Sequence, residues 1–287
     1  MFVVRHGKVF KTLITQVSKM SCITPDEYTQ VVRKGDVIDF CARCVEKVGI
    51  SHEHSRELGE VLVAGDYRGH YSHGINRLAM YVRDVELKVC DSNSEPVIEK
   101  ETASTALVNG KNLLGPVVGN FAMKLAIEKA KLSGIAWVAV RGSNHYGIAG
   151  WYSLMAVQQG LIGLSCTNTS PLVYPTRSKA RTLGTNPITI AAPSSNPGDE
   201  FVLDMATSSV ALGKATSDPA VAIDQGALMP LGGEEHNSGY KGYGLGMVVE
   251  IFCGILADAA FGPHIRQWMN TDREANLASV CYLFILQ

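Results

Sequence analysis

The sequence lacks several features that would assign it to whole classes of protein. It has no run of 18 or more apolar residues, so nothing in it predicts a membrane-spanning helix. Its 26 basic and 27 acidic residues nearly cancel to a net charge of -1, which argues against a partner such as nucleic acid or an anionic membrane surface. With 46% hydrophobic and 18% charged residues, the 287-residue chain has ordinary globular composition and room for a sizeable core.

The seven cysteines form neither a disulfide framework nor a structural zinc site. Their number is odd and they are scattered, which is typical of free thiols in a reducing compartment. Cys41 and Cys44 form one C-x-x-C, but no second pair follows at ligand spacing. His70 and His73 have metal-like spacing, as has the H-x-H at 52–54, without an obvious carboxylate or cysteine partner. We therefore expect no metal, and a metal-dependent hydrolase that uses His70 and His73 stays a minor alternative.

Two common catalytic fingerprints are also absent. No G-x-G-x-x-G follows a predicted strand, since the glycines between Gly242 and Gly246 have the wrong spacing and lie in a helical pattern. No G-x-S-x-G nucleophile elbow is present either. Generic motifs alone therefore indicate only an α/β protein and favour an enzyme, without a reaction class.

The compartment is predicted only coarsely. The thiol pattern favours the cytoplasm. The first 20 residues contain Arg5, Lys8, Lys11 and Lys19 and no acidic residue, a weak likeness to a mitochondrial transit peptide. We expect a cytoplasmic protein, with a mitochondrial location as the alternative.

Hydrophobic periodicity predicts an α/β fold with a helical N-terminal part. Apolar residues in 36–48 recur at helical spacing, Gly49 ends that helix and Ser51 caps the next one. From about residue 104 helices alternate with short apolar strands. We expect helices at 117–132, 147–159 and 241–260, and strands at 106–110, 135–140, 161–166, 185–192, 201–204 and 228–231.

The stretch with the most chemistry is Asp66 to Arg77, which reads D-Y-R-G-H-Y-S-H-G-I-N-R. Its His73 can exchange a proton near neutral pH, and Ser72 can orient that histidine or relay the proton. Arg77 can clamp a carboxylate through two parallel charge-assisted hydrogen bonds. A 2-hydroxy acid substrate requires this set of groups. The alternative is a polar surface loop without a chemical role.

Six strings take the interpretation further because they occur in a fixed order: R-G-H-Y-S-H-G-I-N-R (68–77), V-R-G-S-N-H-Y-G-I-A-G (140–150), L-G-T-N-P-I (183–188), L-D-M-A-T-S (203–208), A-L-G-K (211–214) and G-Y-K-G-Y-G-L (239–245). Together they strongly resemble the malate/L-lactate dehydrogenase family that is unrelated to the Rossmann-type malate and lactate dehydrogenases. Ureidoglycolate and sulfolactate dehydrogenases belong to the same family. The resemblance runs from about Val37 to Asn276 and is far more specific for the family than for the substrate.

The resemblance implies an oxidoreductase that transfers a hydride between NAD or NADP and a 2-hydroxy acid/2-oxo acid pair such as malate or L-lactate. It implies an α/β fold in which a mostly antiparallel sheet, not a Rossmann crevice, holds the cofactor beside a helical N-terminal domain. It also implies a homodimer. The expected divisions are an N-terminal extension (1–23), a mostly helical domain with the catalytic loop (24–100), an NAD(P)-binding α/β domain (101–240), and a C-terminal helix that returns to the helical domain before a truncated tail (241–287).

Position by position, the resemblance makes His73 the acid/base residue, Ser72 its relay partner and Arg77 the carboxylate clamp. His145, in the N-H-Y-G string, is a rival for the acid/base role. The other predicted contacts are Thr185 and Asn186 with the substrate, and His145, Tyr146, Gly147, Ile148, Ala149, Asp204, Met205, Ala206 and Lys241 with the cofactor.

Two departures from the family pattern qualify this prediction. After Lys214 the chain runs straight into a segment that family members reach only after a longer linker, as if by an internal deletion. The tail from Ala278 is unlike the family's next strand, which predicts a missing strand and a weakened cofactor site. A catalytically impaired isoform that only dimerises is therefore the second hypothesis. Lys214 also stands where imine-reducing relatives have Asp, which favours alcohol oxidation.

Overall fold

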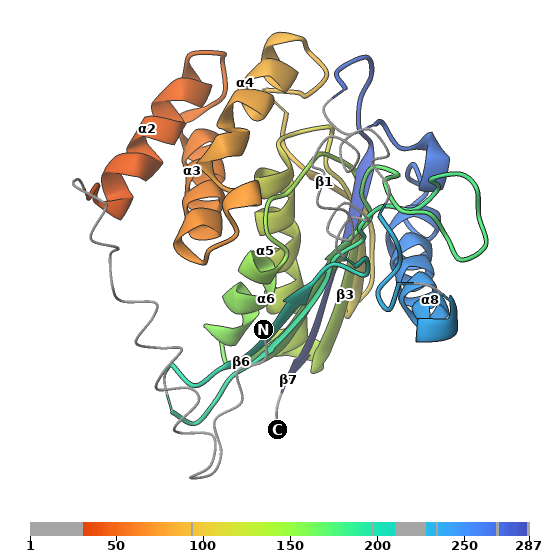
Figure 1. The fold of residues 1–287 in the computed structure, drawn as a ribbon. Coiled ribbons are helices and arrows are strands. Elements are labelled where there is room, and N and C mark those ends of the chain that lie inside the picture. The colour runs from red at the N-terminus through yellow and green to blue at the C-terminus, as the bar shows by residue number, and fades with distance from the viewer. Residues whose placement is uncertain are drawn as a thin grey trace.

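The computed structural model describes residues 31–92, 94–196, 198–209, 228–233, 235–267 and 270–285, without the side chains of 282–285 (Figure 1). The expected N-terminal extension (1–23) and the predicted junction at Lys214 lie outside these residues. In the part of the chain that is described, no helix has the length and apolar character needed to cross a membrane.

Three helices form the N-terminal layer: α2 (Lys34–Glu46), α3 (His52–Tyr67) and α4 (Leu78–Glu86). As predicted, Ser51 caps α3, because its hydroxyl accepts a hydrogen bond from the backbone N–H of His54. The three helices bury Leu58, Leu62 and Tyr81 in a common cluster. Two 3₁₀ turns, η1 (Tyr71–His73) and η2 (Ile75–Arg77), join α3 to α4. The stretch from Asp66 to Arg77, called the histidine-rich loop below, is thus held between packed helices.

A seven-stranded sheet lies beside this layer, in the order β1-β2-β3-β7-β4-β5-β6. The strands are β1 (Val97–Glu101), β2 (Thr105–Asn109), β3 (Ile135–Ser143), β4 (Leu161–Thr167), β5 (Ile188–Ala192), β6 (Phe201–Met205) and β7 (Leu277–Ile285). β2 and β3 pair in parallel and are joined through α5 (Gly115–Ser133), whereas the other five neighbouring pairs are antiparallel. The prediction of a mostly antiparallel sheet is confirmed.

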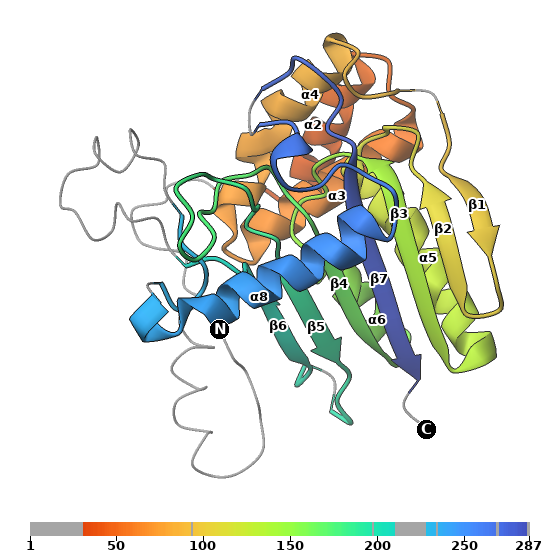
Figure 2. The ribbon, with the colours of Figure 1, turned by 90° about the vertical axis from the view of Figure 1, so that its right-hand side faces the viewer.

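Helices cover both faces of the sheet. α5 and α6 (Gly150–Val157) lie on one face, toward the N-terminal layer, and α8 (Gly239–Glu250) crosses the other face (Figure 2). The π-helix η5 (Ile251–Ile255) continues α8. Val249 and Cys253 pack against Val280 of the sheet, so the expected return of this helix to the helical domain is wrong. The physical reason is that the central strands are apolar on both faces. The face opposite α5 and α6 is therefore shielded from water by α8 and η5.

The strand β7 occupies the middle of the sheet, between β3 and β4. Cys281 pairs with Val138 on one side and Ser165 on the other, and Val280 is fully buried. The expected loss of a strand at the tail is therefore wrong. A run of β-branched, aromatic and other apolar residues satisfies the demands of a central strand.

Two smaller differences concern short strands. β1 was not predicted, because its charged side chains at an exposed edge leave little apolar pattern to detect. The strand expected at 228–231 is wrong: Leu228 and Pro230 form only isolated bridges, to Val173 and Ser208. Pro230 has no N–H to continue a ladder.

Replacing Val280 by Ala tests the position of β7. The change removes two buried methyl groups from the sheet centre and is expected to lower the free energy of unfolding by roughly 2–3 kcal/mol. Urea unfolding followed by circular dichroism measures it. The control is Leu132→Ala, at a side chain that is 88% exposed, which should stay within about 0.5 kcal/mol of wild type. Equal effects of the two changes would contradict a central β7.

Candidate active site

The histidine-rich loop is closed on itself by Asp66. The Asp66 carboxylate accepts a hydrogen bond of 2.9 Å from the backbone N–H of Ile75. A Cβ at Gly74 would overlap that carboxylate, and a Cβ at Gly65 would come within 2.9 Å of the His73 carbonyl oxygen. Only residues without a side chain leave room for these close approaches, so the two glycines allow the turns that carry the reactive side chains.

Ser72, His73 and Arg77 come together as predicted. The Ser72 hydroxyl lies 2.8 Å from Nδ1 of His73, and Nε of Arg77 donates a 2.6 Å hydrogen bond to the Ser72 carbonyl oxygen. Burial lowers the pKa of His73, and the charges of Arg77 and His70 lower it further. His73 is therefore neutral at pH 7 in a site that favours negative charge.

His145, in the loop that follows β3, joins the same site. Its ring stacks on that of His73, with the centroids 5.4 Å apart and the planes at 22°. Burial lowers the pKa of His145 to about 3, and the charges of His73 and Arg77 add to the effect. The two rivals for the acid/base role are thus neighbours, and the proton affinity of one depends on the other.

Tyr81, on α4, was not among the predicted residues. Its hydroxyl lies 2.5 Å from Nδ1 of His145 and 3.1 Å from the His145 carbonyl oxygen. The backbone N–H of Gly147 approaches the same Nδ1 at 3.4 Å. An N–H can only donate, so we assign Nδ1 as the acceptor, the Tyr81 hydroxyl as its donor and Nε2 as the protonated nitrogen. The i, i+4 spacing from Arg77 to Tyr81 was the available signal, since it puts both on one face of a helix.

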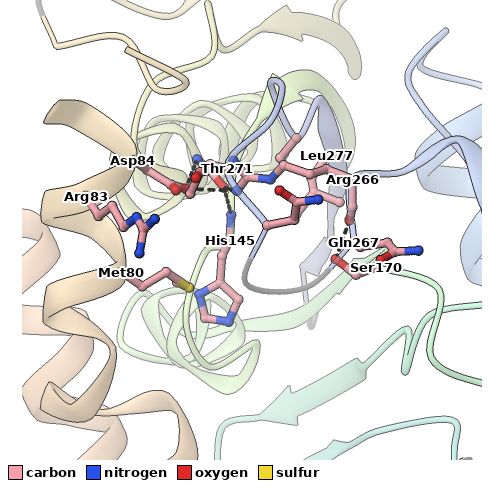
Figure 3. A pocket seen from close by; sticks show the side chains of 12 residues that line it. Met80, Arg83, Asp84, His145, Ser170, Arg266, Gln267, Thr271 and Leu277 are labelled. Carbon is pink, nitrogen blue, oxygen red and sulfur yellow. Dashed lines mark hydrogen bonds and ion pairs between the residues drawn. The ribbon is translucent and has the colours of Figure 1, made fainter. Parts of the chain in front are cut away.

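A cavity of about 50 Å³ opens beside His145 (Figure 3). α4 lines it with Met80, Arg83 and Asp84, and Ser170 and the segment from Arg266 to Leu277 complete the wall. The cavity lies against α4, the helix that begins directly after Arg77. His145 is one of the residues that line it.

A buried ion pair forms one side of this cavity. Nη2 of Arg266 lies 2.8 Å from Oδ2 of Asp84, and Nδ2 of Asn144 donates to the same oxygen at 3.2 Å. Oδ1 of Asn144 in turn accepts from the backbone N–H of His145 at 2.8 Å. Arg266 was missed because its role depends on a partner far away in the sequence.

The two predicted substrate-pocket residues take different positions. Asn186 is completely buried, where its Oδ1 accepts from the Thr169 N–H and its Nδ2 donates to the Gly246 carbonyl and to Glu250. All its polar groups serve to tie two loops to α8, so nothing supports a substrate contact by this side chain. Thr185 is half-buried and donates its backbone N–H to Thr169.

The predicted cofactor string after His145 is mostly interior. Tyr146, Ile148 and Ala149 are 3–4% exposed, and a Cβ at Gly147, which has φ +81°, would lie 2.4 Å from Val61. A ligand could meet these residues through their backbone but not through their side chains. In the described structure Gly147 packs this string closely against Val61 of α3.

The predicted contacts at the end of β6 are arranged differently. Asp204 accepts a 2.8 Å hydrogen bond from the Gly150 N–H at the start of α6. Burial raises the pKa of Asp204, while that hydrogen bond and the charges of His70 and Arg68 oppose the rise. Met205 is half-buried, and the Ala206 that follows it is exposed.

Lys241 is exposed in the first turn of α8. The neighbouring Gly242 packs on Leu231, whose N–H donates to the Thr207 carbonyl. The start of α8 therefore lies close to the segment that follows β6, and Figure 2 shows the two at the same side of the sheet. A cation at a helix N-terminus suits a phosphate group.

The described residues contain no group of three or more His, Cys, Asp and Glu side chains that could hold a metal ion. The H-x-H histidines face carboxylates instead, His52 that of Glu46 and His54 that of Glu95. Burial raises the pKa of Cys41 to about 11, so this member of the C-x-x-C is a neutral thiol.

Comparison with known proteins bears on this arrangement. A family model described as malate/L-lactate dehydrogenase matches residues 32–216 and 211–286, so the match includes the tail that was expected to differ. Its two segments meet at the predicted junction.

The chain is 40% identical to malate dehydrogenase of Pyrococcus abyssi, over 91% of this chain and 76% of that protein. It is 38% identical to malate/(S)-sulfolactate dehydrogenase of Methanothermus fervidus, over 85% and 73% respectively. The solved structure of malate dehydrogenase from Pyrococcus horikoshii superposes with a TM-score of 0.84 at 40% identity, covering 90% of this chain and 76% of that one.

Replacing His145 by Gln tests the electrostatics of the site. Between pH about 6.5, the unfolded value, and about 3, the unfolded chain binds a proton at this residue that the folded chain does not. The stability that neutral His145 provides is therefore complete above pH 6.5 and falls as the pH falls, by up to about 1.4 kcal/mol per pH unit. Urea unfolding at pH 7.5, 5.5 and 4.5 should show a shallower loss in the variant than in wild type. The exposed His264→Gln is the control, and an unchanged slope in His145→Gln would refute the burial argument.

Proposed function

This chain belongs to the malate/L-lactate dehydrogenase family, and we propose that it transfers a hydride between NAD(P) and a 2-hydroxy acid/2-oxo acid pair such as malate and its oxo acid. The observation that carries the proposal is the meeting of the Ser72–His73 pair, Arg77 and the Tyr81–His145 pair at one site. This combination offers an anion clamp and proton-exchange groups within contact distance of each other. The reaction class requires both.

We assign the carboxylate of the substrate to Arg77. Its guanidinium is held from behind by the Ser72 carbonyl, so its direction is fixed before the substrate arrives. Burial lowers the pKa of both histidines, and the charge of Arg77 lowers it further. The same positive charge attracts a carboxylate. By reciprocity, a bound anion raises the proton affinity of both rings.

We propose His73 as the group that exchanges the hydroxyl proton. Its Nδ1 is paired with the Ser72 hydroxyl, which holds the ring and offers a path for the proton. His145, with a pKa of about 3, is a poor proton acceptor and instead donates a hydrogen bond from Nε2 to the substrate oxygen. The reverse assignment, with His145 as the acceptor, is the alternative.

The described residues fit a dinucleotide. Lys241 and the N-terminus of α8 offer positive charge to a pyrophosphate, and the segment 204–206 lies close to them. When bound, NAD(P) supplies or accepts the hydride. We propose that residues 101–240 hold the cofactor and 24–100 the catalytic loop. Free thiols at the six described cysteines favour a reducing compartment, the cytoplasm or the mitochondrial matrix.

We further propose a homodimer. Leu245, Val248, Ile251 and Ile255 are 40–50% exposed and follow one another along the outer side of α8 and η5. A stripe at this spacing marks one face of a helix, and its burial against a second copy would remove apolar surface from water.

The first experiment is to titrate purified protein with NADH and NADPH by fluorescence, and then to follow nicotinamide absorbance as a panel of 2-oxo acids is added. Binding of one nucleotide and turnover of a 2-oxo acid is the expected result. Binding without turnover would favour the alternative of a catalytically impaired isoform. A folded protein that binds neither nucleotide contradicts the proposal.

Replacing Arg77 by Leu should lower kcat/KM for the 2-oxo acid by about 100-fold or more, because a charge-assisted pair with the substrate carboxylate is lost. Arg77→Lys keeps the charge without the bidentate geometry, so its kcat/KM should lie between those of wild type and Arg77→Leu. Steady-state kinetics measures both. A loss of protein yield without a kinetic change would remove Arg77 from the site.

His73→Ala and His145→Ala separate the two acid/base assignments. If His73 carries the proton, kcat/KM for alcohol oxidation in wild type should decrease at acidic pH as His73 becomes protonated, with a pKa below the usual value for histidine. His73→Ala should abolish this acidic limb of the pH profile. His145→Ala should lower the rate and leave that limb in place. The opposite pattern would transfer the role to His145.

A further inference from the structure

Three side chains at intervals of three residues form a ridge along α4: Arg77, which directly precedes the helix, and Met80 and Arg83 within it. Residues at this spacing follow one another along a helix surface. The rise of about 1.5 Å per residue puts Arg83 about 9 Å beyond Arg77 along the axis. The ridge therefore offers two cations separated by a flexible apolar side chain.

The far end of the ridge lies at the cavity beside His145. Met80, Arg83 and His145 line the same wall, and in Figure 3 the Arg83 side chain extends from α4 toward the cavity above the Met80 sulfur. Arg77 is at the near end, where it acts electrostatically on His145. A molecule held at Arg77 with its reacting carbon at the histidines has its remaining atoms directed along Met80 toward Arg83.

The charges of the cavity wall are unbalanced. Its lining contains two arginines, Arg83 and Arg266, against one carboxylate, Asp84, so two positive charges less one negative leave one positive charge with the histidine neutral. Asp84 is used by Arg266 at 2.8 Å, in a pair that is almost wholly buried. Among the described residues no carboxylate pairs with Arg83, which is exposed on its helix. Arg83 is the uncompensated cation.

We propose that Arg83 is a specificity residue that binds a second anionic group of the substrate, so that the preferred substrates are dianionic 2-hydroxy acids rather than monoanionic ones. The inference rests on the proposed function and adds to it the residue that distinguishes between its substrates. The second group is a carboxylate or a sulfonate on the carbon next to the reacting centre, since each presents oxygens to a guanidinium fork. A methyl group in its place would leave Arg83 unsatisfied.

The spacing agrees with this chemistry. A guanidinium carbon stands about 4 Å from a carboxylate carbon that it binds bidentately, a distance set by hydrogen bonds of about 2.8 Å. Two such contacts, one at each end of a four-carbon diacid, span a distance similar to the axial separation of Arg77 and Arg83, with the side chains free to adjust. Met80, between them, contacts the carbon chain.

The test compares three 2-oxo acids in the reductive direction: oxaloacetate, 3-sulfopyruvate and pyruvate. Steady-state kinetics is measured on the full chain for wild type, Arg83→Gln, Arg83→Lys and the control Arg43→Gln. Arg43 is exposed on α2 and is not among the residues that line the cavity, and its loss changes the net charge by the same amount.

Wild type should prefer the two dianions over pyruvate. Arg83→Gln should reduce the ratio of kcat/KM for oxaloacetate to that for pyruvate by about 10- to 100-fold, mainly through KM, because a charge-assisted contact to the ground state and the transition state is lost alike. Arg83→Lys should keep part of the wild-type ratio, and the control Arg43→Gln should keep the whole of it. A larger loss for 3-sulfopyruvate than for oxaloacetate would identify a sulfonate as the second group, and the reverse a carboxylate.

Three outcomes overturn the inference while the proposed function stands: wild type turns over pyruvate as well as the dianions, Arg83→Gln lowers all substrates equally, or Arg83→Gln changes none. Absence of turnover with every oxo acid and either nucleotide removes the proposed function and this inference with it. Circular dichroism of Arg83→Gln confirms that the comparison is made on folded protein.

Discussion

The buried pair between Asp84 and Arg266 is the contact on which the geometry of the site depends. It joins α4, the loop after β3 and the segment that leads into β7, and Asn144 completes it. Pairs of this kind contribute little net stability, because both charges lose their hydration, but the loss of one partner costs several kcal/mol. Here the pair fixes a position: Asn144 also holds the backbone of His145, so the ring that faces the cavity is placed by the same contact. The helix α4 and the strand at the sheet centre are thereby coupled to one imidazole.

The two stacked histidines have a second property in common, which is that both are neutral in an environment of positive charge. Tyr81 holds the ring of His145 and Ser72 that of His73, each through a hydroxyl group at Nδ1. A bound anion would compensate the charge of Arg77 and make protonation of one ring easier. With the roles proposed above, the proton for reduction of an oxo acid becomes available only when the acid is bound. Substrate binding and acid catalysis would then be linked without a conformational change.

The loop from Asp66 to Arg77 and most strands could be predicted from the sequence because their signals are local: a dense set of reactive side chains, and apolar runs bounded by glycines. The same was true of the helices α5 and α6. Tyr81 and Arg266 could not be found, because each acquires its role from a residue on another element, His145 and Asp84 respectively. Asn186 was misleading for the opposite reason, since a polar residue in a loop motif turned out to be completely buried as a tie to α8. β7 was expected to be lost, because its residues were compared with the family's rather than judged as a strand.

The position of β7 has a consequence for how this sheet comes into existence. β1-β2-β3 and β4-β5-β6 are each continuous in sequence and can pair internally, but they meet only through residues 277–285. Until those residues emerge from the ribosome, β3 and β4 both present open edges that can pair with the wrong partner. The contacts that close the sheet join positions more than a hundred residues apart, as Val138 and Cys281 do, which makes this step slow. In a cell the chain is therefore expected to depend on chaperones that shield strand edges during synthesis, well before any cofactor can bind.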